Sequence, residues 1–94
     1  MATVSSAPPV DVKTAVKIAT RYFNDLFQHP FTDLAVEEVE LSDDRQAWRV
    51  TLGYVLTDPG LPAYFGSNKS SREFKVITID AQTGEPTSMK IKKF

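Results

Sequence analysis

Few side chains in this sequence can do acid–base, nucleophilic or metal chemistry. There is no cysteine, and His29 is the single histidine. A chain without cysteine has no disulfide, thiolate zinc site or cysteine nucleophile, and one imidazole leaves little for metal-dependent or triad catalysis. His29 precedes Pro30 near a predicted helix end, and we expect it to interact with the helix dipole. The sequence therefore predicts no catalytic residue and no enzyme.

Acidic side chains crowd one stretch and raise the question of a calcium site. Their spacing lacks the Asp-x-Asp-x-Asp-Gly order that arranges oxygens around one ion. We expect them to lie on solvated strand edges or to pair with Lys and Arg across strands, so the sequence predicts no metal and no cofactor. The six residues are Asp33, Glu37, Glu38, Glu40, Asp43 and Asp44.

The 57–71 segment is the first candidate for a binding site. It has 15 residues, two prolines and two glycines, and loops of this length are often functional. It also carries Leu61, Tyr64 and Phe65. Two interpretations stay open: these side chains cover the end of the core, or they are exposed anchors for a partner protein, as aromatic residues often are.

Basic residues gather in the second half of the chain. The net charge is −1, divided as −4 over residues 1–47 and +3 over residues 48–94. A basic surface on the last two strands could bind single-stranded nucleic acid, but lysines on a terminal strand also guard against edge-to-edge pairing. The chain lacks the global basic excess of nucleic-acid modules, so this is the alternative prediction. The candidates are Lys69, Arg72, Lys75, Lys90 and Lys92.

The length and composition predict one small domain. The chain has 94 residues, 41% of them apolar, enough for one two-layer core. We expect residues 1–9 to be a disordered lead-in and residues 10–94 to form the domain. The sequence shows no secretory signal at its start and no run of about 20 apolar residues that could span a bilayer. We therefore expect a cytoplasmic protein without a membrane partner.

Helical periodicity begins after Asp11, which we expect to be the N-cap. Pro30 disfavours helical backbone at the residue before it, so the helix should end near Gln28. Apolar residues recur at helical spacing and predict one stripe that packs on a sheet. The stripe consists of Val12, Ala15, Val16, Ala19, Tyr22, Phe23 and Leu26.

The rest of the chain shows the period-two pattern of four strands. In the first strand the alternation slips at Glu37 and Glu38, which predicts a β-bulge. In the third, Val76 and Ile77 are adjacent, so either one is exposed or another bulge intervenes. Pro86 should lie at the start of the last strand or on an edge. Alternating apolar residues mark the second strand most clearly: Trp48, Val50, Leu52, Tyr54 and Leu56.

One helix followed by four strands predicts an α+β fold, in which an N-terminal helix packs on a four-stranded antiparallel meander sheet. Trp48 should lie in the core with a partner for its indole N–H. We expect polar side chains on the opposite face of the sheet: Arg49, Thr51, Lys75 or Glu73, Lys90 and Lys92.

Residues 12–93 resemble the PepSY-like domains. The resemblance rests on the helix at 15–27, the Val- and Glu-rich strand and aromatic-led strand within 33–52, and the final hairpin at 72–91 with its Asp-Ala-Gln-Thr-Gly-Glu turn, residues 80–85. It implies a mostly non-catalytic interaction or regulatory module, in some members one that restrains a peptidase. The outline also resembles the cystatin shape, but the chain lacks the glycine trunk and Gln-x-Val-x-Gly loop by which cystatins inhibit proteases.

The sequence thus predicts a non-catalytic protein-binding or regulatory module that acts through the 57–71 loop and a surface or edge of the sheet. An exposed edge strand can pair with an extended segment of another protein or with a second copy, so a homodimer through a sheet edge is included. The alternatives are a nucleic-acid-binding accessory domain and a small-ligand carrier, which would need an apolar cavity with convergent polar groups.

Overall fold

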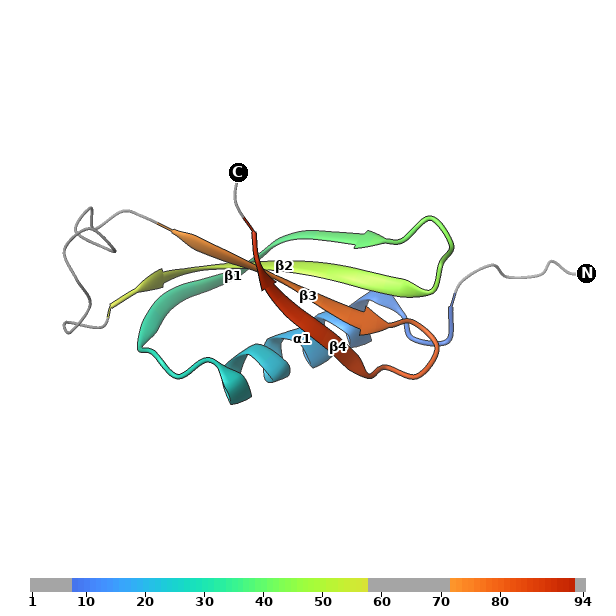
Figure 1. Cartoon of the computed structure of the whole chain (residues 1–94), viewed down its shortest axis with the longest axis horizontal. Coiled ribbons are helices and arrows are strands. Elements are labelled where there is room, and N and C mark those ends of the chain that lie inside the picture. The colour runs from blue at the N-terminus through green and yellow to red at the C-terminus, as the bar shows by residue number, and fades with distance from the viewer. Residues whose placement is uncertain (1–7, 58–71, 93–94) are drawn as a thin grey trace, which may run out of the picture.

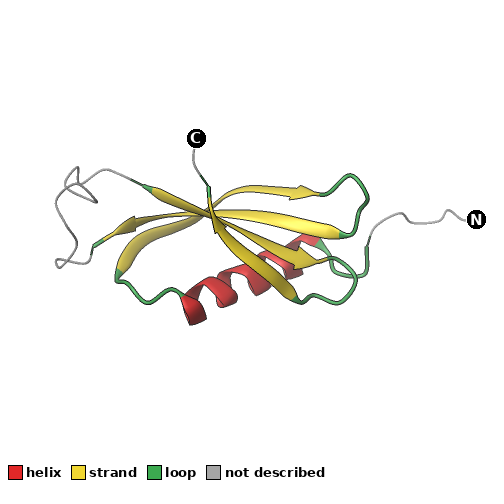
Figure 2. Ribbon diagram, viewed as in Figure 1, coloured by secondary structure: helices red, strands yellow, loops and turns green. Residues whose placement is uncertain are grey.

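A computed structural model describes residues 8–57 and 72–92 of the chain. One helix, α1 (Val12–Leu26), is followed by four strands: β1 (Phe31–Leu41), β2 (Ala47–Leu56), β3 (Glu73–Asp80) and β4 (Pro86–Ile91). The strands form an antiparallel sheet in the order β1-β2-β3-β4. Helix α1 lies along one face of this twisted sheet (Figures 1 and 2). The predicted α+β meander is confirmed.

Helix α1 begins as predicted and ends earlier than predicted. Asp11 is the N-cap, and its Oδ1 accepts the backbone N–H of Thr14 at 2.9 Å. The helix stops at Leu26, because Phe27 already has extended backbone. In this conformation the ring of Phe27 stacks on Phe23, with 4.8 Å between ring centroids, so aromatic packing ends the helix before the proline does.

The face of α1 that packs on the sheet is narrower than the predicted stripe. Ala15, Ala19 and Phe23 are fully buried, whereas Val12 and Leu26, at the two ends, are 43% and 47% exposed. The prediction that these two residues pack on the sheet is wrong. A straight helix and a twisted sheet diverge away from their closest approach, so the terminal residues of the stripe lose contact with the strands.

Strand β2 supplies the centre of the core. Val50, Leu52 and Tyr54 are buried beneath α1, beside Ile77 and Ile79 of β3. The pairing of β2 with β3 is regular, so no bulge separates Val76 from Ile77 and Val76 faces away from the helix.

Trp48, at the start of β2, links the segment that precedes the helix to the sheet. Its ring packs against the core, and its indole N–H donates to the carbonyl of Val10 at 2.8 Å. The backbone N–H of Val10 donates in turn to the carbonyl of Ala81 at 3.1 Å. The predicted indole partner is therefore a backbone carbonyl, and these two bonds fix the entry to α1.

The turn between β3 and β4 is built on Asp80 and Gly84. The Asp80 carboxylate accepts the backbone N–H groups of Gln82 and Thr83 at 2.7 and 3.1 Å. Gly84 has φ of +82°, a conformation that glycine adopts without strain. Pro86 follows as the first residue of β4, which is an edge strand. Both predicted positions for this proline are confirmed.

Strand β1 carries two bulges. The predicted one lies between Val36 and Glu38, and a second lies between Thr32 and Ala35. Asp33, inside the second bulge, has φ of +56°, a region that Asp tolerates better than most residues. No slip in the apolar alternation marks this second bulge in the sequence, because Asp33 and Leu34 still read as a polar–apolar pair.

Arg72, just before β3, holds both bulges of β1 in place. Its guanidinium donates to the carbonyl of Asp33 at 3.0 Å and to the carboxylate of Glu37 at 2.8 Å. This ion pair lies directly over Gly53 of β2: a Cβ built there would be 2.6 Å from Glu37 Oε2 and 2.7 Å from Arg72 Nη2. A side chain at position 53 would therefore have to displace the flexible ends of Glu37 and Arg72.

We predict that Gly53→Ala and Arg72→Ala destabilise the protein non-additively. Alanine at position 53 must displace the two side chains of the ion pair. Most of the resulting loss in unfolding free energy should disappear in a variant that already lacks the Arg72 side chain. Urea unfolding of the wild type, both single variants and the double variant should give a coupling of about 1 kcal/mol, within the range found for residues in contact. Additive losses of unfolding free energy would show that the glycine at position 53 is not coupled to this ion pair.

Candidate functional site

The predicted loop site lies outside the described residues. Leu61, Tyr64 and Phe65, proposed from the sequence as protein-binding residues, fall in this part of the chain, as does Lys69. Most of the predicted lead-in, residues 1–9, lies outside as well. Both interpretations of the loop aromatics stay predictions.

Of the remaining candidates for a basic surface, Lys90 and Lys92 line one depression on the sheet face opposite the helix, and Lys75 does not share that face. Arg72 binds Glu37, and the Lys92 ammonium lies 2.8 Å from the Glu38 carboxylate. Lys90 is exposed on the sheet face opposite the helix and has no ion pair with any described residue. Two of the four described cations are thus neutralised by acids of β1.

Lys75, the fourth, lies on the helix side of the sheet. It is paired with Leu52 in the β2–β3 register, and Glu73 is paired with Tyr54, so both side chains share the face of the core residues. The expectation that one of them lies on the opposite face is wrong. Ile77 and Ile79 point into the core. Because side chains alternate between the two faces along β3, Phe74 and Val76 lie on the outer face.

The acidic stretch acts largely as a set of partners for cations. Glu37 and Glu38 pair with Arg72 and Lys92 as described, and Glu40 lies 3.7 Å from Arg49 on β2. This confirms the prediction of cross-strand pairing. Among the described residues, no three His, Asp or Glu side chains gather closely enough to hold a metal ion.

Asp44 has a different role, in the turn between β1 and β2. Its carboxylate accepts the Ser42 hydroxyl at 2.6 Å and the backbone N–H of Gln46 at 3.0 Å. These two hydrogen bonds to the charged form lower the pKa of Asp44. Asp44 therefore stabilises a tight turn.

His29 is exposed and lies three residues beyond the end of α1. Its ring meets the ring of Phe27 edge-on, with 5.5 Å between centroids. The expectation that it interacts with the helix dipole is wrong, because the helix ends at Leu26 and the dipole acts only within the last turn.

The outer edge of β4 is the first structural feature suited to binding. The backbone N–H of Lys92 donates to the carbonyl of Phe74 on β3 at 3.0 Å. Since backbone groups alternate sides along an antiparallel strand, Lys90 also points its N–H and C=O toward β3, whereas Met89 and Ile91 point theirs away. β4 is the last strand in the order, so these outward groups have no strand partner within residues 8–57 and 72–92.

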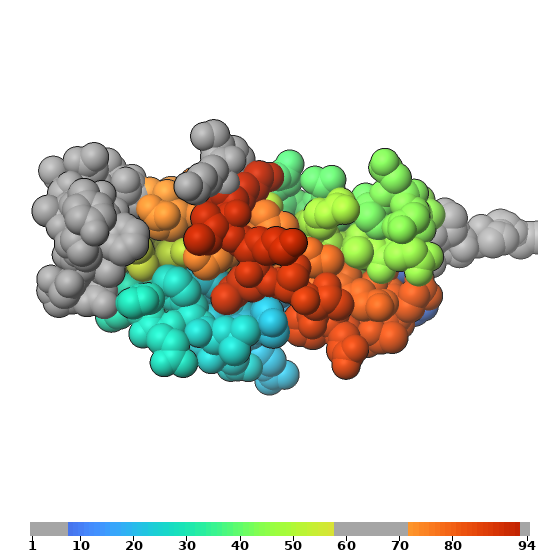
Figure 3. Space-filling view, viewed as in Figure 1, coloured from blue at the N-terminus to red at the C-terminus, as the bar shows by residue number. Residues whose placement is uncertain are grey.

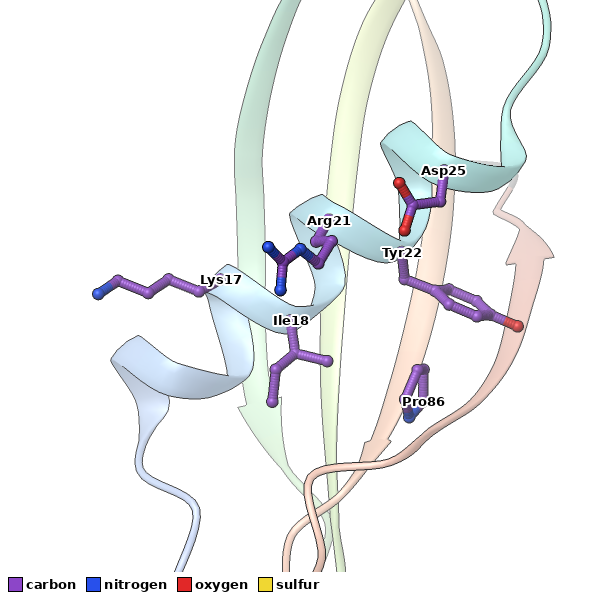
Figure 4. Close-up of a pocket in the computed structure, with 6 residues that line it drawn as sticks. All are labelled: Lys17, Ile18, Arg21, Tyr22, Asp25 and Pro86. Carbon is purple, nitrogen blue, oxygen red and sulfur yellow. The ribbon is translucent and has the colours of Figure 1, made fainter.

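A groove runs between this edge and the helix. Its volume is about 590 Å³, and Ile18 and Tyr22 of α1 line it opposite Pro86 of β4. Figure 4 shows the Tyr22 ring directed toward β4, with Asp25 near it, whereas the side chains of Lys17 and Arg21 extend from the helix away from that strand. In the space-filling view a notch separates the helix from the start of β4 (Figure 3). A strand added to β4 would therefore find a partly apolar groove on its helix side.

The opposite edge, β1, is less suited to pairing. Its two bulges interrupt the regular alternation of backbone groups, and Glu37, Glu38 and Glu40 are engaged by cations. Bulges and charges are the usual means by which a sheet edge avoids pairing. β4 has a bulge too, at Thr87, but its residues from Ser88 to Ile91 pair regularly with β3, so the two edges of the sheet are not equivalent.

The second feature suited to binding is a cavity near the C-terminal end of α1. It has a volume of about 230 Å³ and is lined by seven described residues: Phe27, His29, Tyr54, Leu56, Glu73, Lys75 and Ile91. The Lys75 ammonium lies 5.6 Å from the ring centroid of Phe27 and 5.9 Å from that of Tyr54. Burial lowers the pKa of Lys75. Sequence analysis missed this cavity because it placed Lys75 on the wrong face.

Comparison of the chain with protein-family models, curated proteins and solved structures finds no match.

Because Tyr54 is buried, the stability of the folded protein depends on pH in the alkaline range. The buried ring and the nearby Glu73 raise the pKa of its phenol from 10.0 to about 12. The unfolded chain ionises first, so the stabilisation is complete below pH 10 and is lost between pH 10 and about 12. Tyrosinate absorbance should show a late titration phase that Tyr54→Phe removes. A variant that retains this phase would contradict the assignment to Tyr54.

Proposed function

We propose that this protein is a non-catalytic protein-binding module and that it binds an extended, acidic segment of a partner protein along the free edge of β4. The observation that carries the proposal is the outward-facing backbone of Met89 and Ile91 on β4, a strand whose first residue, Pro86, lines an open groove. In strand addition, main-chain hydrogen bonds supply affinity and the side chains of the added strand supply specificity.

The side chains around the edge indicate which segment would fit. On the outer face the nearest cation is Lys90, which has no ion pair among the described residues. On the helix side the exposed Ile91 and the groove offer apolar contact, and the charged residues that line the groove are Lys17, Arg21 and Asp25. Side chains of an added strand alternate between these two faces. The complementary segment therefore alternates acidic and apolar residues.

A homodimer through two β4 edges fits the charges less well. Antiparallel pairing of two copies brings Lys90 and Lys92 of each copy near the same residues of the other. Like charges across neighbouring strands are destabilising. An acidic partner removes this repulsion, so a different protein is favoured over a second copy.

The resemblance to PepSY-like domains supports the same class of function, because that family is mostly non-catalytic. The nucleic-acid alternative gains no support from the described cations, since Arg72 and Lys92 are paired with carboxylates and Lys75 lies on the helix side.

We predict that a synthetic peptide of alternating glutamate and valine binds along β4 and that Ile91→Pro weakens it. The N–H of Ile91 points away from β3, so proline there removes an edge donor without breaking the existing ladder. The loss of one hydrogen bond should reduce affinity by about fivefold to tenfold. NMR titration of the full chain, following the Met89 and Lys90 amide signals, measures this effect.

Ile91→Thr is the matched control, because it shortens the same side chain and keeps the N–H. It should bind the peptide nearly as well as the wild type, and Lys90→Glu should shift preference toward a lysine–valine peptide. Equal binding of the two peptides by the wild type, or equal affinities of the proline and threonine variants, would contradict binding at this edge.

A further inference from the structure

The cavity near the end of α1 has room for a small molecule. Its volume is about 230 Å³, and an apolar cavity of about 150 Å³ is known to hold benzene. Phe27 and Tyr54 provide aromatic walls, and Leu56 adds an aliphatic one. The lining is thus suited to a molecule with one ring or a branched apolar body.

Two hydrogen-bond donors line this cavity without an acceptor from the described chain. The Lys75 ammonium has no carboxylate within 4.0 Å among residues 8–57 and 72–92. The Tyr54 hydroxyl makes no hydrogen bond to any of these residues either. No described side-chain N or O atom is both buried and without a partner, so the Tyr54 hydroxyl is the part of this 1% exposed side chain that reaches the cavity wall. Such a pair is complementary to a carboxylate, which accepts several hydrogen bonds.

The electrostatics restrict the ligand further. Lys75 is partly desolvated, as the lowering of its pKa indicates, and a carboxylate would compensate for the water that its ammonium has lost. Glu73 lies beside the same cavity and interacts with both Tyr54 and Lys75. Its negative charge disfavours a ligand with a second anionic group. A single carboxylate therefore fits better than a phosphate or a dicarboxylate.

We propose that this cavity is a binding site for a small aromatic monocarboxylate, with its carboxylate at Lys75 and Tyr54 and its ring against Phe27. Ile91 of β4 also lines this cavity, but the site differs from the β4 edge in its ligand and in the polar side chains that recognise that ligand. Its test uses none of the variants that test protein binding, so either proposal can fail alone.

Benzoate and phenylacetate are suitable probes, titrated against the full chain and followed by the NMR signals of Phe27, Tyr54 and Lys75. We predict saturable shifts at these residues. Lys75→Met should weaken binding by about tenfold or more, because a hydrogen bond to a charged group contributes that much. Tyr54→Phe, which keeps the ring, should weaken it several-fold.

Three controls separate the site from general binding. Lys90→Met makes the same substitution on the opposite sheet face and should leave affinity unchanged. Benzamide and benzylamine keep the ring and lack the carboxylate, so they should bind more weakly. If Lys75→Met unfolds, Tyr54→Phe and the comparison of the four ligands still decide the question. The proposal would be overturned if the signals did not shift, or if Lys75→Met and Tyr54→Phe bound the carboxylates as tightly as the wild type. Tighter binding of benzylamine than of benzoate would also overturn it.

Discussion

The contact between Phe23 of α1 and Tyr54 of β2 is the interaction on which the rest of the structure depends. Both side chains are buried, and their ring centroids lie 5.0 Å apart. Phe27 stacks on Phe23 and also meets Tyr54, at 4.9 Å. This cluster packs the C-terminal half of the helix against the sheet, and it therefore determines where α1 ends. The α1–β4 groove and the end cavity both lie at the margins of that contact.

The charge asymmetry of the chain has a structural cause. Acids of the first half lie on β1, and cations of the second half reach them across the outer face of the sheet. Exposed ion pairs contribute little stability individually, but Arg72 also spans both bulges of β1 and lies over Gly53. These contacts shape and neutralise the β1 edge. In contrast, β4 pairs regularly with β3 from Ser88 to Ile91, beyond a bulge at Thr87, and Lys90 has no ion pair among the described residues.

Local patterns allowed much of the fold to be predicted, because they depend on neighbouring residues. The Asp11 cap, the bulge at Glu37 and the turn at Gly84 are of this kind. The exposure of Leu26 and the position of Lys75 depend on how the sheet twists and on the pairing of distant strands, which no local pattern encodes. The edge was foreseen only in general terms, and the cavity was missed, because both arise from the way the elements meet.

The central claim is that β4 presents backbone groups free to pair with an added strand. Amide hydrogen exchange of the full chain, resolved residue by residue by NMR, tests it most directly. The account predicts that Met89 and Ile91 exchange rapidly, whereas Lys90 between them is protected by its bond to β3. Equal protection of all three amides would show that the edge is already covered and would contradict the account.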